Sequence, residues 1–229
     1  MSLMVFTLSA QEYDETRYAN VVKQLNLDPS KVYHELYTEK KMPNSEYSYI
    51  IVIPVVKQKV TDDYFLLNNY ILITDENGLI KTRYLDTAEI TSDAIMLQSF
   101  TIDTGLYNLT SNIRAFGVVA NYTGSSRPNP YSSSKISIYY PYGKILKKVL
   151  SDYDLYSSGG EWDMSCTGQF YENRSVIILD QAKNNGFANL KIKTISTETI
   201  SKEIDGECSE NKTSKTSYKI LRFNKSVYK

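Results

Sequence analysis

The chain has 229 residues, of which 41% are hydrophobic and 23% are charged, and its aromatic side chains include 20 Tyr and 7 Phe. A chain of this length buries well over half of the surface that it exposes when unfolded, so we expect one large domain with a true core. Its 26 basic and 26 acidic residues cancel, and this balance argues against a nucleic acid as the main partner.

Residues 1–10 read as the end of a signal peptide. The stretch from Leu3 to Ala10 is apolar or small, ends in Leu-Ser-Ala and precedes the polar residue Gln11. This order is typical of a signal-peptide cleavage site and predicts export to the periplasm or the extracellular space; the alternative is a first apolar strand. No apolar run reaches the roughly 18 residues of a membrane-spanning helix, so no transmembrane span is expected.

Residues 11–46 are predicted to form an N-terminal helical segment. Asp28 is the expected N-cap of a second short helix, with Pro29 at its first position and its end at Pro43. His34 lies off the apolar stripe of that helix and is expected to be an ordinary surface residue. The stripe of the first helix consists of Tyr18, Val21, Val22 and Leu25, and that of the second of Val32, Tyr33, Leu36 and Tyr37.

Residues 47–229 are predicted to form an all-β domain. A β-branched run at 49–56 is one strand, and the runs 70–74 and 79–84 form a hairpin in which Asn77-Gly78 supplies positive-φ positions. The predicted fold class is mainly β: an antiparallel sandwich, a barrel or an irregular propeller-like array, with a short N-terminal helical segment. Further strands are expected at 94–102, 113–121, 135–140, 144–150, 162–171, 174–180, 188–196 and 216–223, separated by turn signals that include Pro141-Tyr142-Gly143, Glu172-Asn173 and Asn184-Asn185-Gly186.

The two cysteines, Cys166 and Cys208, fit one disulfide in an exported protein. A zinc site would need further ligands, and the single histidine, His34, lies far upstream. The same shortage makes a Ser-His-Asp or Cys-His arrangement improbable. We therefore expect a disulfide, no metal, no cofactor and no enzymatic activity.

The longest loop predicted from the sequence is residues 123–134, which hold two prolines and six Ser or Thr residues. Such a segment has little to bury and belongs on the surface. It is either a plain connector or a recognition loop that presents Arg127 and Tyr131, two residue types that often anchor interfaces.

A second candidate recognition loop is Ser158-Gly159-Gly160-Glu161-Trp162. Two adjacent glycines permit a tight, exposed backbone that would hold Ser158 clear of its neighbours, and Cys166 would fasten the nearby tryptophan. The alternative is an ordinary β-turn with a tryptophan packed in the core. Glu161 and Asp163 also flank the tryptophan, and alternation along a strand would place both carboxylates on one face, as a hydrolase with paired carboxylates requires.

The segment from Asp180 to Leu190 looks like a degenerate calcium loop. Its ligand positions hold Gln181, Lys183, Asn185 and Asn189. Because a lysine amine cannot coordinate calcium and carboxylates are missing, the turn is expected to persist without a metal.

Four short motifs lie between about residue 99 and residue 228: Phe116-Gly117-Val118, Gly160-Glu161-Trp162 with Cys166-Thr167-Gly168, Asn185-Gly186-Phe187 with Leu190, and Leu221-Arg222-Phe223. Through these motifs this part of the chain resembles the periplasmic lysozyme-inhibitor-like family, which includes immunity proteins against secreted cell-wall hydrolases. Inhibitors of that type plug the lysozyme cleft with an exposed Ser-Gly-x-x-Tyr loop, and the segment from Ser158 to Trp162 is similar, with Trp in place of Tyr.

These observations lead to three functional hypotheses. The resemblance implies an inhibitor of a peptidoglycan hydrolase, in which Ser158 would hydrogen-bond a catalytic carboxylate and Trp162 would stack on the cleft wall. The second is an envelope module that binds a carbohydrate or a protein, favoured by Tyr139, Tyr140 and Tyr142 around one turn. The third is the hydrolase with paired carboxylates described above.

Overall fold

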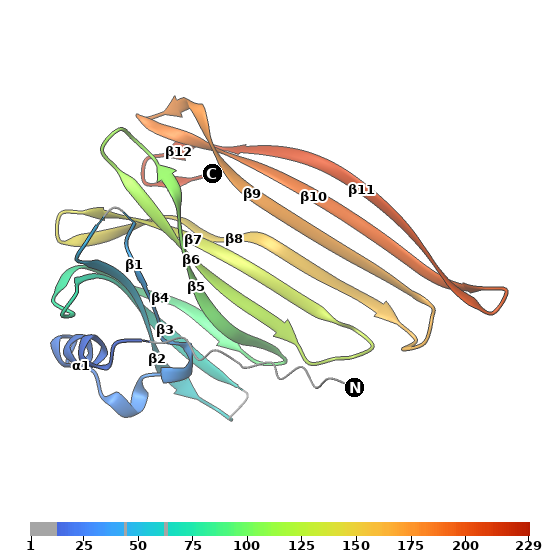
Figure 1. The fold of residues 1–229 in the computed structure, drawn as a ribbon, viewed down its shortest axis with the longest axis horizontal. Helices are drawn as coiled ribbons and strands as arrows, with labels where there is room; N and C mark the ends of the chain where they lie inside the picture. Colours follow the sequence, from blue (N-terminus) through green and yellow to red (C-terminus); the bar gives the residue numbers. More distant parts are fainter. Residues whose placement is uncertain (1–12, 44, 62–63) are drawn as a thin grey trace.

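A computed structural model describes residues 13–43, 45–61 and 64–229, and the predicted signal-peptide remnant lies outside these ranges. The described residues form one α-helix, two short 3-10 turns and thirteen strands (Figure 1). The elements are α1 (Glu15–Gln24), η1 (Pro29–Lys31), η2 (His34–Leu36), β1 (Thr38–Lys41), β2 (Ser48–Lys59), β3 (Phe65–Asp75), β4 (Ile80–Ser92), β5 (Ile95–Asn108), β6 (Arg114–Gly124), β7 (Tyr131–Tyr142), β8 (Ile145–Trp162), β9 (Gly168–Asn184), β10 (Phe187–Ile204), β11 (Glu207–Leu221), β12 (Phe223–Asn224) and β13 (Val227–Tyr228).

Strands β1 to β8 form a nearly closed, barrel-like sheet in the order β1-β2-β3-β4-β8-β7-β6-β5. Neighbouring strands are antiparallel except at the seam between β4 and β8, where the parallel register consists of the single pair Arg83 and Ile145. On the open side, the Lys40 ammonium of β1 donates to the Ile102 carbonyl of β5 over 3.1 Å. The prediction of a mainly β fold is confirmed, in its barrel-like form.

The barrel interior explains the uninterrupted apolar run of β2. Ile50 and Val52 point into the barrel core, whereas Ile51 and Ile53 pack beneath α1 on the outside. A strand buried on both faces has no polar side to alternate with, so its sequence is continuously apolar. The buried members of the interior cluster are Leu36, Ile50, Val52, Phe65, Leu67, Ile71, Ile73, Leu97, Phe100, Ile102, Phe116, Val118, Ala120, Tyr139 and Leu146.

The first predicted helix is confirmed as α1. The Asp14 carboxylate caps its N-terminus by accepting from the Arg17 backbone N–H, and Val21 and Val22 are buried against the sheet. Arg17 is also buried and forms an ion pair with Glu39 of β1. The helix therefore contacts the barrel edge through Arg17, and its apolar face packs on β2 and β3. In the described part of the chain this ten-residue element is the longest helix, too short to cross a bilayer.

The second predicted helix is wrong. Asp28 does cap a turn that begins at Pro29, but the turn is the three-residue η1, followed by η2 and then by strand β1. Val32 and Tyr37, which suggested part of a helical stripe, have an extended backbone instead. Val32 forms an isolated bridge with Val55 of β2. Exposed His34 lies at the start of η2, with its ring 4.8 Å from that of Tyr13.

Strands β9, β10 and β11 form a long arm that leaves the barrel from the far half of β8 (Figure 1). The first half of β8 pairs with β7 and bridges β4, and only the part from Tyr156 to Trp162 pairs with β9. Register shifts and the positive φ of Asp152 (48°) interrupt β8 between these halves. Such irregularities bend a strand, so β9 splays away from the barrel.

A second core fills the wedge that this splay opens. Side chains on the outer face of the barrel meet those at the base of the arm and on the C-terminal hairpin of β12 and β13. Phe187 and Phe223 stack there with ring centroids 3.9 Å apart. The buried members of this cluster are Tyr107, Leu109, Ala115, Val119, Ile136, Ile138, Tyr140, Val149, Leu150, Leu190, Ile192, Leu221, Phe223 and Tyr228.

Several predicted turns need correction. Glu172-Asn173 lies inside β9, and the stretch from 200 to 215, for which no strand was predicted, belongs to β10 and β11. At Asn77-Gly78 only the glycine has a positive φ. At Asn185-Gly186 both residues do (51° and 81°), as a two-residue hairpin requires.

The predicted disulfide between Cys166 and Cys208 is confirmed. It joins the loop between β8 and β9 to the start of β11, across 42 residues of sequence. In the chain-entropy account, closing a loop of this length stabilises the fold by about 4 kcal/mol.

A buried charge network holds the β4–β8 seam. The Asp86 carboxylate of β4 accepts from the Lys148 ammonium of β8 at 2.7 Å and from the Tyr139 hydroxyl of β7 at 2.9 Å. The Asp86 and Lys148 side chains are each only 9% exposed. Because one backbone pair joins β4 to β8, these side chains carry much of the contact across the seam.

We predict that Asp86→Ala lowers the free energy of unfolding by about 3 kcal/mol, because it leaves the buried Lys148 ammonium with only the exposed Asp152 carboxylate, 3.7 Å away, as a counter-charge. Urea denaturation followed by circular dichroism measures this change. The matched control is the double variant Asp86→Ala with Lys148→Met, which removes both charges and is expected to be clearly less destabilised. An equal loss in both variants would show that the ion pair does not support the seam.

Candidate functional site

The segment from Ser158 to Trp162 is not the protruding loop that its glycines predict. It forms the last five residues of β8, and all five pair with β9, whereas only Ser158 and Gly159 also pair with β7. Gly159 faces Tyr131 of β7 and Tyr171 of β9 in the register. The segment is therefore a strand end rather than a free loop, and the inhibitor hypothesis stays a prediction without the protruding loop that it expected.

The two glycines serve close packing rather than a turn. A Cβ atom at Gly159 would lie 2.7 Å from the Tyr171 hydroxyl, and one at Gly160 would lie 2.5 Å from a ring carbon of Phe170. The aromatic rings of β9 therefore lie over the glycines, Tyr171 on one face of the sheet and Phe170 on the other. A larger side chain at either position would push a ring away.

Trp162 fastens the neighbouring loop. Its indole N–H donates to the Arg127 carbonyl at 2.8 Å, and its backbone N–H donates to the Pro128 carbonyl at 3.0 Å. The indole is half-buried, with its centroid 6.4 Å from that of Phe170. The sequence suggested either a protruding tryptophan or one packed in the core, and neither is found. Trp162 instead holds the surface loop between β6 and β7 by hydrogen bonds.

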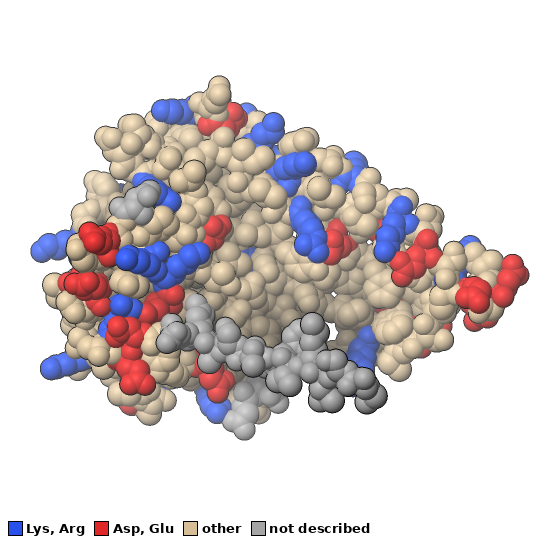
Figure 2. Space-filling model, viewed as in Figure 1, with Lys and Arg blue, Asp and Glu red and all other residues tan. Residues whose placement is uncertain are grey.

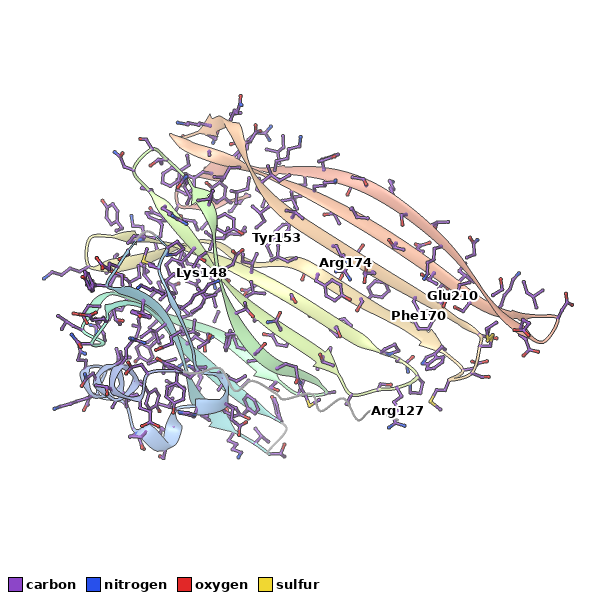
Figure 3. The ribbon with its side chains drawn as sticks, viewed as in Figure 1. Arg127, Lys148, Tyr153, Phe170, Arg174 and Glu210 are labelled. Atoms are coloured by element: carbon purple, nitrogen blue, oxygen red, sulfur yellow. A yellow bond between two sulfur atoms is a disulfide. The ribbon has the colours of Figure 1, made fainter. Side chains whose placement is uncertain are left out.

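The predicted recognition loop is shorter than expected, because β6 ends at Gly124 and β7 begins at Tyr131. Its exposed Arg127 lies at the far end of the sheet, on the opposite side of the molecule from Lys148 of the barrel (Figure 3). Tyr131 pairs with Gly159, so the predicted loop at 123–134 and the segment from Ser158 to Trp162 are neighbours in the structure.

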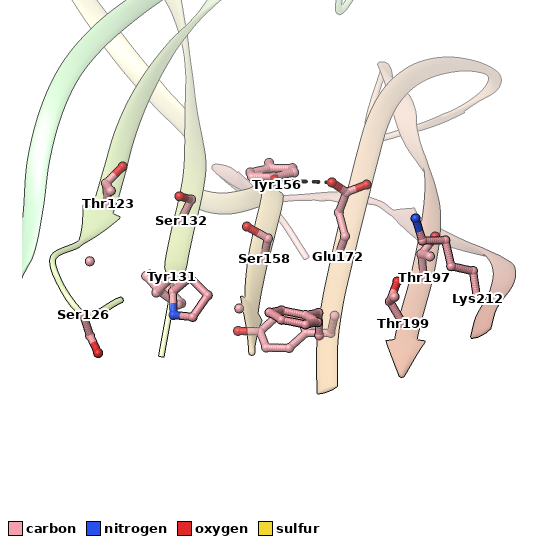
Figure 4. Close-up of a pocket in the computed structure, with 15 residues that line it drawn as sticks. Thr123, Ser126, Tyr131, Ser132, Tyr156, Ser158, Glu172, Thr197, Thr199 and Lys212 are labelled. Atoms are coloured by element: carbon pink, nitrogen blue, oxygen red, sulfur yellow. Dashed lines mark hydrogen bonds between the residues drawn. The ribbon is translucent and has the colours of Figure 1, made fainter. Parts of the chain in front are cut away.

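A groove of about 580 Å³ crosses the sheet where these constellations meet (Figure 4). Six of its side chains carry aliphatic hydroxyls and four are aromatic, and Glu172 and Lys212 supply one charge of each sign. The residues that line it are Thr123, Gly124, Ser126, Pro130, Tyr131, Ser132, Tyr156, Ser158, Gly159, Phe170, Tyr171, Glu172, Thr197, Thr199 and Lys212. A second hollow of about 810 Å³ shares Tyr131, Gly159, Phe170 and Tyr171 with it.

Glu172 is held in place within the groove. Its carboxylate accepts from the Arg174 guanidinium at 2.7 and 2.9 Å and lies 3.4 Å from the Tyr156 hydroxyl. The hydrogen bonds from Arg174 lower the pKa of Glu172 below its usual value. This side chain is therefore an ionised, oriented hydrogen-bond acceptor at neutral pH.

The paired carboxylates of the hydrolase hypothesis do not form a pair in the structure. The Asp163 carboxylate accepts from the backbone N–H groups of Ser165, Cys166 and Thr167 at 2.9–3.0 Å, which shapes the loop that carries the disulfide. The bond from Ser165, with those from the other two, lowers the pKa of Asp163. A general acid needs a raised pKa, and Glu161 is exposed on the neighbouring strand end.

The tyrosines that suggested a sugar-binding row are mostly internal. Tyr139 is in the barrel core and Tyr140 in the second core, and only Tyr142 is exposed, with the Lys147 ammonium 3.7 Å from its ring centroid. The exposed row predicted at this turn is wrong, because β7 alternates between two buried faces.

The degenerate calcium loop is a hairpin between β9 and β10. Asn185, one of the predicted ligand positions, donates through its amide to the Phe223 carbonyl at 2.9 Å, and Asn184 donates to the same oxygen at 2.7 Å. These bonds hold the hairpin against the C-terminal hairpin. Across residues 13–43, 45–61 and 64–229, no group of three or more His, Cys, Asp or Glu side chains is arranged to hold a metal ion.

Comparison with protein-family models, with curated proteins and with solved structures found no match to this chain. The resemblance to lysozyme inhibitors therefore stays a prediction that rests on the sequence motifs alone.

Sequence reasoning missed the part of the groove that lies on β9, β10 and β11. Phe170, Tyr171 and Glu172 come from β9, and Thr197, Thr199 and Lys212 come from β10 and β11. The signal that could have found the aromatic part is the pair Phe170-Tyr171 shortly after Gly168, next to a glycine pair in the preceding strand. Large rings beside glycines on adjacent strands are a known way to fill a sheet surface.

We predict that Gly160→Ala destabilises the protein by about 1–3 kcal/mol, because the added Cβ meets Phe170 and, at 2.6 Å, the Gln169 carbonyl oxygen. Thermal unfolding with a matched urea series measures this loss. Ser158→Ala, two residues earlier on the same strand, is the control and should change stability by no more than about 0.5 kcal/mol. If Gly160→Ala matched the control, the ring would not be fixed over the glycine.

Proposed function

We propose that this protein is an exported, non-catalytic binding protein that holds a carbohydrate in the groove between β6 and β11. The observation that carries the proposal is the composition of the groove, in which aromatic rings, aliphatic hydroxyls and one oriented carboxylate converge. Sugar rings offer C–H faces that pack on aromatic side chains and a rim of hydroxyls that exchange hydrogen bonds.

The aromatic side chains give the groove a preformed floor. Phe170 is half-buried, and its ring is fixed over Gly160 by the close approach described above, on the same face of the sheet as Glu172. Tyr156 lies on that face too, with its hydroxyl 3.4 Å from the Glu172 carboxylate. Rings that are already in place cost little conformational entropy when a ligand stacks on them.

Glu172 would orient the bound sugar by accepting hydrogen bonds from its hydroxyls. As an ionised acceptor fixed by Arg174, it can take hydrogen bonds from two neighbouring sugar hydroxyls, and hydrogen bonds to a charged group are stronger than neutral ones. Ser158 and Thr199 add hydroxyls that donate or accept as the ligand requires.

The ionised state of Glu172 favours binding of a sugar over its hydrolysis. Glu172 is the acidic residue among the described residues that line it, and the Arg174 hydrogen bonds lower its pKa. Glycoside hydrolysis uses two carboxyl groups, one of them with a raised pKa. The groove is therefore proposed to recognise a glycan without cleaving it.

Export is part of the proposal. The disulfide between Cys166 and Cys208 is typical of oxidising compartments outside the cytoplasm. The apolar residues before Gln11 agree with a cleaved signal peptide. An exported binding protein of this kind would meet envelope or extracellular glycans.

The test is a glycan array that includes chitin and peptidoglycan fragments, followed by isothermal titration calorimetry with the best ligand. We predict that Phe170→Ala weakens binding about tenfold, since a lost stacking surface of about 1–2 kcal/mol corresponds to a factor of roughly ten. Glu172→Gln should weaken it several-fold, through loss of the charged acceptor.

The matched control is Tyr142→Ala, which removes an exposed tyrosine (57% exposed) outside the groove and should leave the affinity unchanged. Circular dichroism verifies that each variant is folded. The proposal fails if no glycan binds, or if Phe170→Ala and Tyr142→Ala bind the same ligand equally well.

A further inference from the structure

Strand β11 is a long free edge of the sheet. In the part of the chain that the structure describes it pairs with β10 alone, and 14 of its 15 residues are exposed. The ladder between β10 and β11 runs from Leu190–Leu221 to Ile204–Glu207 without a register shift. Figure 1 shows the strand along the outer border of the arm.

Proteins usually protect such edges, because the unpaired N–H and C=O groups of an edge strand can pair with another chain. Common protective devices are proline, a bulge, or a very short strand. β11 contains no proline, has no bulge against β10 and is 15 residues long. Its charged side chains are the remaining feature, and their order along the strand is informative.

The charges of β11 are self-complementary. Two acidic residues, Glu207 and Glu210, come first, and three basic residues, Lys212, Lys215 and Lys219, follow; Glu210 and Lys212 lie 2.9 Å apart within the strand. When two copies of the strand run antiparallel with Asn211 on a two-fold axis, Glu207 of one copy lies opposite Lys215 of the other. Glu210 then lies opposite Lys212, so the two-fold symmetry produces four cross-strand pairs of opposite charge.

The remaining positions in this register are compatible with it. Cys208 lies opposite Ser214, Ser209 opposite Thr213, and Asn211 opposite its own copy, so no like charges meet. Each pair joins residues an even number of positions apart, as two-fold antiparallel pairing requires. Basic and acidic side chains also alternate along the arm on the face shown in Figure 2.

We propose that two copies of this protein associate through the edges of β11, in antiparallel register about Asn211. The unpaired backbone N–H and C=O groups of one edge hydrogen-bond to those of the other. The four charge pairs select this register over neighbouring ones. Because every side chain involved is exposed, the association is reversible and weakens as salt screens the charges.

The proposed contact goes beyond the proposed carbohydrate site and does not depend on it. Lys212 belongs both to the pairing edge and to the wall of the groove. Pairing therefore places two grooves next to each other on one continuous sheet. A polymeric ligand that occupies both would gain avidity without any new contact in either groove.

The experiment is a charge swap read by sedimentation velocity at low ionic strength, with no carbohydrate present. Lys212→Glu with Lys215→Glu makes the pairing segment 207–215 wholly acidic, and Glu207→Lys with Glu210→Lys makes it wholly basic. We expect the wild type to form dimers, each variant alone to dimerise at least tenfold more weakly, and an equal mixture of the two variants to regain the dimer.

The mixture is the decisive arm, because all four opposite-charge pairs return only when one acidic and one basic edge meet. The control Lys144→Glu with Lys225→Glu makes the same change in net charge at exposed positions outside β11 and should dimerise as the wild type does. A monomeric wild type, unweakened single variants, or a mixture that stays monomeric would each overturn the proposal.

The register has its own test. Asn211→Cys places a thiol on the two-fold axis, where the facing Cα atoms are close enough for a disulfide, and mild oxidation is expected to give a covalent dimer. Ser214→Cys is the matched control, since its thiol faces Cys208, which is already paired with Cys166. Efficient cross-linking of Ser214→Cys instead of Asn211→Cys would overturn the register.

Discussion

Strand β8 is the element on which the rest of the structure depends, because it belongs to the barrel at one end and to the arm at the other. At the barrel end, one backbone pair and the network of Asp86 with Lys148 join it to β4. Past the irregular stretch at Asp152 it leaves β4 and accepts β9. Without this change of partner the arm would have no strand to extend from, and the second core would have no wedge to fill.

The fit between β8 and β9 is set by Gly159 and Gly160. An ordinary side chain at these positions would compete for space with Tyr171 and Phe170, the rings of which lie on opposite faces of the sheet. Phe170 lines the groove on the face that carries Glu172, and Tyr171 lines the second hollow. One packing requirement therefore joins the arm to the barrel and positions the aromatic surface of the candidate site.

The sequence predicts those parts of the fold that local patterns determine. The β-branched run of β2, helix α1, the Asn185-Gly186 turn and the disulfide follow from short-range rules and are found. Glycines admit two explanations, a turn or a close approach, and only the neighbouring strand decides between them. The first part of β11, before the predicted strand 216–223, was missed for a different reason: its residues are all exposed, so it lacks the apolar alternation that reveals a half-buried strand.

That polarity has a structural consequence at the tip of the arm. β9 begins at Gly168, opposite Ser201, whereas β10 and β11 continue pairing to Ile204 and Glu207. The last residues are therefore a two-stranded ribbon with no apolar face, a structure that is marginal in water by itself. Cys208 lies in this ribbon, and its bond to Cys166 ties it to the loop that precedes β9. The disulfide thus stabilises the part of the sheet that packing stabilises least.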